Sequence, residues 1–144
     1  MSQASRHLAI RAVRDDIGSA AEWLHEAGEA LGVPAAQCHR LDMCLDEVLA
    51  NIVSHGGPTA LEGDVQLTLE RGGDGDQPSA LLKVSDLGVP FNPLLAPEKP
   101  LAVSLDDAEP GGLGLVMMKR FADELAYRHA EGRNELSVTV RWPD

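Results

Sequence analysis

The sequence has few of the features that mark secreted or membrane proteins. Its 144 residues include only two cysteines, Cys38 and Cys44, and both fall within one predicted helix. Residues that face each other on a helix are three or four positions apart, so this pair is poorly spaced for a disulfide bond. We interpret both as reduced side chains. No apolar run approaches the ~20 residues of a membrane-spanning helix, and no signal peptide opens the chain, so we expect a soluble, cytoplasmic protein.

Basic residues are also scarce. The chain carries 12 Lys and Arg against 23 Asp and Glu, which gives a formal net charge of −11. Duplex DNA and anionic membranes require a basic surface, so neither is an expected partner. A basic protein partner is compatible with this charge, and so is the simpler interpretation that acidity keeps the protein soluble. The hydrophobic fraction of 44% is typical of a globular protein, and the length fits one compact domain over residues 1–144.

Hydrophobic periodicity predicts the elements of the first half of the chain. Apolar residues alternate in a first strand from about Arg6 to Val13. Helical spacing follows from Ile17 to Leu31, and Gly32 supplies a stop signal. A second helix begins near Pro34, buries one apolar stripe and ends before Gly56. These patterns predict a strand followed by two helices.

After the second helix the period changes to two. Val65, Leu67 and Leu69 alternate with polar residues, and residues 80–84 predict the returning strand of a hairpin. Residues 72–76 are rich in glycine and predict a loose turn between the two strands. Five prolines between residues 90 and 110 predict a long loop with at most a helical turn around residues 104–107.

The last third of the chain predicts one helix and two strands. Residues 112–124 have helical spacing, and strands follow over residues 125–130 and 136–142. The resulting order is β-α-α-β-β-loop-α-β-β. This order predicts an α/β (α+β) two-layer sandwich, in which helices cover one face of a largely antiparallel sheet.

Two polar residues in the second predicted helix are candidates for a site. Glu47 and Asn51 are one helical turn apart and share a face, at the edge of the apolar stripe. A carboxylate there can take a proton from a hydroxyl group or from water, and an amide oxygen is a suitable ligand for Mg²⁺. Taken alone, the pair has a simpler interpretation as a solvated helix edge. His55, one turn further, is interpreted as a local hydrogen-bonding residue.

A second candidate segment follows the returning strand of the hairpin. Asp86 ends that strand, and Gly88 two residues later permits a close approach of the backbone. A carboxylate at a strand end can accept a hydrogen bond from an exocyclic amine such as that of adenine. The alternative interpretation is an Asx turn, which is common after a strand.

The third candidate segment is Gly111-Gly112-Leu113-Gly114-Leu115, which leads into the last predicted helix. Glycines let backbone N–H groups converge on an anion, and a helix N-terminus adds a favourable dipole and free donors. The segment is not a Walker A loop, because no Gly-Lys-Ser/Thr follows, and it is not G-x-G-x-x-G, because residue 117 is Met.

In this order and spacing, the three segments together resemble the ATP-binding fold of the GHKL superfamily, which includes the histidine-kinase-like ATPases. The resemblance is closest to the bacterial serine-protein kinase/anti-sigma factor family. Residues 47–55 are similar to that family's N-box, residues 86–93 to its first glycine box, and residues 112–117, with Asp123-Glu124, to its second. The resemblance extends over essentially the whole chain.

The resemblance implies a role for each matching position. Glu47 would be the general base that deprotonates a substrate hydroxyl group, and Asn51 would be the protein ligand to Mg²⁺. Asp86 would recognise the adenine of ATP, and Gly88 would let the base approach. Gly112-Leu113-Gly114-Leu115 would face the phosphates. Positioning and electrostatics do most of the work in phosphoryl transfer.

The resemblance also implies partners. Kinases of this family phosphorylate a Ser or Thr of a small STAS-type anti-anti-sigma protein, and the free kinase sequesters a sigma factor. Association into a homodimer is expected from the family as well. We therefore expect an ATP- and Mg²⁺-dependent protein serine/threonine kinase that acts by partner switching.

One departure from the family pattern leaves alternatives open. No Lys or Arg lies between Pro100 and Met118, where related proteins often carry an Arg, and Glu109-Pro110 occupies that place. Charge compensation at the γ-phosphate would then depend on Mg²⁺, backbone amides and Lys119. A regulatory module that sequesters a partner without phosphoryl transfer is therefore the second interpretation. A third, the catalytic domain of a two-component histidine kinase, would need a separate histidine-bearing partner.

Overall fold

A computed structural model of the chain describes residues 5–11, 14–55, 63–74, 77–90, 92, 94 and 112–143. Its elements, in chain order, are β1 (Ser5–Arg11), α1 (Arg14–Ala30), α2 (Ala35–His55), β2 (Asp64–Asp74), β3 (Gln77–Asp86), α4 (Gly112–Phe121), β4 (Glu124–Ala130) and β5 (Arg133–Arg141). This order confirms the predicted succession of strands and helices. The predicted proline-rich loop, with its helical turn around residues 104–107, lies almost entirely outside the described residues.

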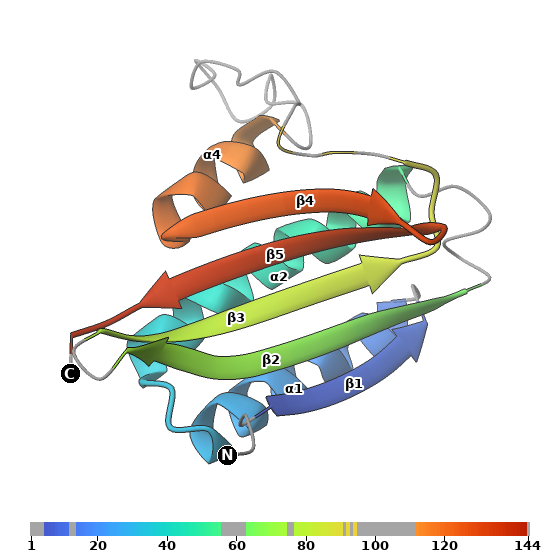
Figure 1. Cartoon of the computed structure of the whole chain (residues 1–144). Helices are drawn as coiled ribbons and strands as arrows, with labels where there is room; N and C mark the ends of the chain where they lie inside the picture. The colour runs from blue at the N-terminus through green and yellow to red at the C-terminus, as the bar shows by residue number, and fades with distance from the viewer. Residues whose placement is uncertain are drawn as a thin grey trace.

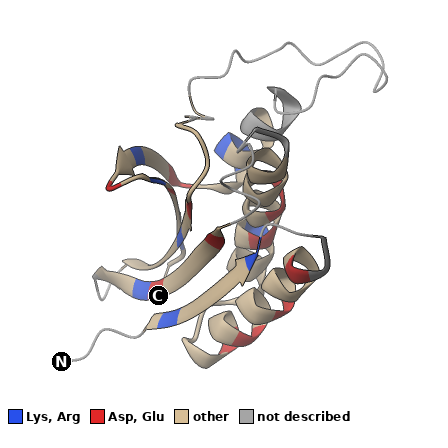
Figure 2. Ribbon diagram, turned by 90° about the vertical axis from the view of Figure 1, so that its right-hand side faces the viewer, with Lys and Arg blue, Asp and Glu red and all other residues tan. Residues whose placement is uncertain are grey.

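The five strands form one sheet in the order β1-β2-β3-β5-β4. Each of the four strand pairs is antiparallel. Figure 1 shows α1 and α2 behind the sheet and α4 beside β4. In the perpendicular view of Figure 2, the helices lie on one side of the strands, with Asp and Glu recurring along α1 and α2. The predicted two-layer sandwich is confirmed.

The core lies between the helices α1 and α2 and the inner face of the sheet. Side chains along β3 and β5 alternate between buried and half-buried positions, because successive residues of a strand point to opposite faces. The buried apolar residues of the sheet are Ile10, Val65, Leu67, Leu69, Ala80, Leu82, Val84, Leu136, Val138 and Val140. A shift of the register by one residue would turn this whole set to the outer face.

The apolar stripe predicted for α2 is buried as expected. Its members are Leu41, Cys44, Leu45, Val48, Leu49 and Ile52. Cys38 and Cys44 are free thiols, as predicted, and both are buried. Burial raises the pKa of the Cys44 thiol to about 11, so this side chain stays protonated near neutral pH. None of the helices in the described part of the chain combines the length and apolar character of a transmembrane span.

Two predicted boundaries are wrong. The loose turn does not begin at Gly72, because β2 continues to Asp74 and Gly73 pairs with Pro78 of β3. Gly73 has a φ of +92°, a backbone conformation that glycine adopts readily. The last helix ends at Phe121 rather than at residue 124, and the strand after it begins at Glu124.

Asp123 joins the end of α4 to its neighbours. Its backbone N–H donates to the Thr139 carbonyl oxygen over 2.8 Å, and its carboxylate accepts a hydrogen bond of 2.6 Å from the Arg141 backbone N–H. Arg40 of α2 lies 3.8 Å from the same carboxylate. These contacts hold the C-terminal end of α4 against β5 and α2, which fixes where α4 lies relative to the sheet.

The two long helices approach each other closely at Gly28, in the last turn of α1. A Cβ atom at this position would collide with Sγ of Cys38 on α2 and would lie 3.8 Å from Cβ of Val33. The Cys38 thiol lies 3.7 Å from the Val33 carbonyl oxygen, to which it donates a weak hydrogen bond. Glycine at position 28 therefore sets the spacing between the helices.

We expect Gly28→Ala to destabilise the protein, although alanine favours a helix. Overpacking costs about 1–3 kcal/mol, which exceeds the about 0.5–1 kcal/mol that alanine gains over glycine in a helix interior. Gly18 is the matched control, because a Cβ there meets no heavy atom within 4 Å, so Gly18→Ala should stabilise. Urea unfolding followed by circular dichroism measures both changes. Equal stability of the two variants would show that the helices do not pack this closely.

Candidate functional site

Asn51 lies in the last turns of α2 and is buried more deeply than a residue at a solvated helix edge would be. Its exposed fraction is 9%, and its side chain has no hydrogen-bond partner in the part of the chain that the structure describes. Two side-chain atoms in the described part of the chain are fully buried without a hydrogen-bond partner, namely Asp42 Oδ1 and Arg71 Nε. The Asn51 amide is not among them, so it keeps an opening to solvent. A buried amide with this access is suited to a ligand.

Glu47 lies one turn before Asn51 on the same helix and is half-buried. Burial raises the pKa of its carboxyl group above the usual value for Glu, because removal from water disfavours the charged form. A carboxylate with a raised pKa is a stronger proton acceptor near neutral pH. The pair predicted from the helix spacing therefore lies on one helix, with the amide buried and the carboxylate half-buried.

Asp86 ends β3 and is buried, with an exposed fraction of 6%. Its Oδ1 accepts a hydrogen bond of 2.7 Å from the Gly88 backbone N–H, which is the Asx-turn geometry that the sequence left open. Oδ1 also accepts from Nδ2 of Asn134 over 3.3 Å. None of the described residues donates to Oδ2. The turn thus uses one carboxylate oxygen and leaves the other for an incoming donor.

The segment Gly112-Leu113-Gly114-Leu115 forms the first turn of α4, as predicted. α4 contacts α2, and Met118 of α4 is buried in the core. The backbone N–H groups of a helix's first turn have no partner within the helix and attract anions. Lys119, the nearest cation that the sequence offers, is exposed on α4.

The C-terminal ends of α2 and β3 lie at the same end of the sheet, and α4 crosses beside β4 (Figure 1). Asp86 and Gly88 are joined directly by a hydrogen bond, and Glu47 and Asn51 occupy consecutive turns of α2. Among the described residues, no hydrogen bond or ion pair joins the α2 pair to Asp86 or to the first turn of α4. The fold therefore brings the C-terminal end of α2 and the Asp86–Gly88 turn to the same end of the sheet, and α4 contacts α2.

A hollow of about 250 Å³ lies on the opposite, outer face of the sheet. Its three cations are paired with carboxylates: Arg133 with Asp64 at 3.2 Å, Arg128 with Glu135 at 3.1 Å and Lys83 with Glu70 at 3.6 Å. Because these charges are already compensated, the hollow is poorly suited to a phosphate group. Its lining residues are Gln66, Thr68, Lys83, Ser85, Arg128, Ala130, Glu131, Arg133 and Glu135.

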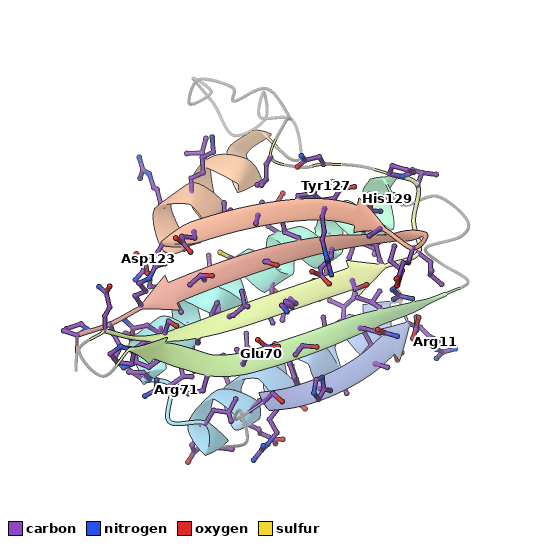
Figure 3. The ribbon with its side chains drawn as sticks, in the orientation of Figure 1. Arg11, Glu70, Arg71, Asp123, Tyr127 and His129 are labelled. Carbon is purple, nitrogen blue, oxygen red and sulfur yellow. The ribbon has the colours of Figure 1, made fainter. Side chains whose placement is uncertain are left out.

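Two residues beside Asp86 were not predicted from the sequence. Asn134 of β5 is buried, with an exposed fraction of 6%, and Tyr127 of β4 donates its hydroxyl hydrogen to Asn134 Oδ1. Figure 3 shows Tyr127 on β4 between Asp123, at the start of the strand, and His129, toward the β4–β5 turn. A signal was available: Asn134 falls in the same alternating series as buried Leu136 and Val138, so a polar residue at its first position indicates a buried polar contact.

Comparison with known proteins shows the family of the chain. The model of the histidine kinase-like ATPase domain family matches residues 10–140. A curated relative, the serine/threonine-protein kinase BtrW of Bordetella bronchiseptica, is 39% identical over 99 residues, which cover 69% of this chain and 67% of BtrW. These matches include most of the described fold.

Two solved structures share the fold. The crystal structure of the RsbU and RsbW domains of Rv1364c from Mycobacterium tuberculosis has a TM-score of 0.66 and 18% identity, covering 96% of this chain and 33% of that one. A chain of the SiaB–SiaC complex from Pseudomonas aeruginosa also has a TM-score of 0.66 and 18% identity, covering 94% of this chain and 88% of that one. The protein therefore belongs to the histidine kinase-like ATPase domain family, and it is similar to a relative named as a serine/threonine-protein kinase.

Proposed function

We propose that the protein is an ATP-dependent protein serine/threonine kinase that acts as an anti-sigma factor by partner switching. It would phosphorylate a STAS-type anti-anti-sigma protein and otherwise sequester a sigma factor. The observation that carries the proposal is the Asn51 amide, which is 9% exposed, has no partner among the described residues and lies one turn from a carboxyl group of raised pKa. The identity to BtrW, itself named a serine/threonine-protein kinase, supports the activity.

The nucleotide would lie along the end of the fold where α2, β3 and α4 present these groups. Oδ2 of Asp86 accepts a hydrogen bond from the exocyclic amine of adenine, while the Asp86–Gly88 turn holds the carboxylate in place. The first-turn amides of α4, from Gly112 onward, receive the phosphates. The amide oxygen of Asn51 fits Mg²⁺, which prefers hard oxygen ligands. When bound, Mg²⁺ supplies positive charge to the phosphate oxygens.

In this arrangement Glu47 acts on the acceptor protein. Its carboxylate takes the proton from a Ser or Thr hydroxyl group as that oxygen forms a bond to the γ-phosphorus and the bond from phosphorus to the ADP oxygen breaks. The carboxyl group is raised in pKa by burial, so it holds the transferred proton better than an exposed Glu would. The products are ADP, the phosphorylated acceptor and a protonated Glu47.

The alternative is a module of the same fold that sequesters its partner without phosphoryl transfer. The absence of Lys and Arg between Pro100 and Met118 favours it, because the γ-phosphate then has fewer cations beside it. The complex of SiaB with SiaC supports a protein partner under either alternative. Label transfer separates the two, since only the kinase moves phosphate to its partner.

Glu47→Gln should abolish most phosphoryl transfer while nucleotide binding persists. Loss of a general base lowers turnover by about a hundred- to ten-thousandfold. The assay follows label from γ-labelled ATP to a purified STAS-type protein. Asp46→Asn is the matched control, because Asp46 is the exposed acidic neighbour on α2 and should retain activity. Equal transfer by wild type and Glu47→Gln would refute the base assignment, and ATP binding without transfer by wild type would favour the inert module.

Asn51→Ala should remove the part of ATP affinity that depends on Mg²⁺. Hydrogen bonds and ligand contacts to charged groups contribute about 1.5–3 kcal/mol, which corresponds to about a 10- to 100-fold loss of affinity. Calorimetric titration of ATP in the presence of Mg²⁺ and of EDTA measures this part directly. The variant's affinity in EDTA should match that of wild type. If Mg²⁺ increases the ATP affinity of the variant as much as that of wild type, Asn51 is not the ligand to Mg²⁺.

The raised pKa of Glu47 also predicts how stability depends on pH. The native state binds this proton more tightly than the unfolded chain, so the stabilising contribution is present below the usual pKa of 4.5 and is lost as pH rises through the folded pKa. Glu47→Gln cannot ionise and should be more stable than wild type near pH 7, with a smaller difference near pH 4. Urea unfolding at both pH values tests this. Glu22→Gln, on the exposed face of α1, should show no such pattern.

A further inference from the structure

Asn134 joins three segments of the chain around Asp86. In the sheet register it lies opposite Asp86 of β3 and opposite His129 of β4. Its Nδ2 lies 3.3 Å from Asp86 Oδ1, 3.3 Å from the Gly88 carbonyl oxygen and 2.9 Å from the Val89 carbonyl oxygen. An amide group has two N–H hydrogens for these three acceptors. Asn134 therefore ties the end of β3 and the backbone after it to β5.

The orientation of the Asn134 amide is determined by its surroundings. The Tyr127 hydroxyl group donates to Oδ1, so Oδ1 faces β4 and the NH₂ group faces Asp86. The reversed orientation would place Oδ1 against a carboxylate oxygen and two carbonyl oxygens, which are all acceptors. Tyr127 thus fixes Asn134, and Asn134 donates to Asp86.

This chain of contacts bears on which base the site accepts. Oδ1 of Asp86 is occupied by the Gly88 N–H and by Asn134, so the carboxylate cannot rotate without breaking two hydrogen bonds. We infer that Asn134 is a positioning residue, held by Tyr127, which keeps Asp86 Oδ2 directed at position 6 of a bound purine and thereby selects an amine over a carbonyl group. The inference rests on the proposed nucleotide site. A carbonyl oxygen at that position would face Asp86 Oδ2, and both atoms are hydrogen-bond acceptors. A buried site strongly disfavours two acceptors facing each other.

A purely structural role for Asn134 predicts a different outcome. Loss of stability or of loop order would weaken the binding of every nucleotide alike, because it lowers the fraction of competent protein. A positioning role instead changes the ratio of two affinities, that for ADP and that for inosine diphosphate, which carries a carbonyl in place of the amine. The ratio is therefore the measurement that separates the two roles.

The experiment is a calorimetric titration of the full chain with ADP and with inosine diphosphate, both with Mg²⁺. Wild type should prefer ADP. Asn134→Ala should reduce that preference about tenfold, and Tyr127→Phe, which removes one oxygen atom, should reduce it about two- to fivefold, as expected for hydrogen bonds of this kind. Ser85→Ala is the matched control, because Ser85 is next to Asp86 on β3 and instead accepts a hydrogen bond of 2.6 Å from Arg133. Its ratio should equal that of wild type.

The possible results distinguish the inference from the proposal on which it rests. A preference for ADP that survives in both folded variants would overturn the role of Asn134 and leave the nucleotide site intact. A wild-type protein that binds both nucleotides equally, or neither, would overturn the adenine assignment of Asp86 and this inference with it. If Asn134→Ala does not fold, the ratio of the two affinities measured for Tyr127→Phe tests the inference by itself.

Discussion

The burial of one face of α2 against the inner side of the sheet is the constraint on which the rest of the structure depends. Six apolar residues of this helix, from Leu41 to Ile52, are buried, and the helix packs over β3 and β5. Burial of apolar surface contributes about 25 cal/mol per Å², so this contact stabilises the fold. Since the helix can turn only one stripe toward the sheet, Glu47 and Asn51 are placed at the border between core and solvent.

The polar exceptions to this core coincide with the candidate site. Among the described residues, the buried polar or charged ones are Asn51, Asp86 and Asn134. A buried polar group is destabilising unless it is hydrogen-bonded. Asp86 and Asn134 bond to each other and to the backbone after β3, whereas Asn51 has no described partner. The fold therefore carries one hydrogen-bonded polar pair, which is suited to recognition, and one amide without a described protein partner, which is suited to a ligand.

Much of this could be predicted from local sequence. Apolar periodicity located both long helices and the last strand, because helix and strand have distinct spacings that one segment reveals by itself. The Asp86–Gly88 turn was also accessible, since an Asx turn involves residues two apart. Prediction failed where a local signal was outweighed by pairing between strands. Gly72 and Gly73 look like turn residues, yet they continue β2 because Ser79 and Pro78 lie opposite them in register.

The sequence by itself determined the order of elements, the acidic character and the three motifs, because each depends on residues close together along the chain. Tertiary structure decided which distant residues meet. Asn134 reaches Asp86 because β3 and β5 pair in a register that places these two opposite each other, and Tyr127 reaches Asn134 from β4. Gly28 is required for the close packing of the two helices, because a side chain there would collide with Cys38 of α2. Such contacts arise from packing of the whole chain, so no local pattern encodes them.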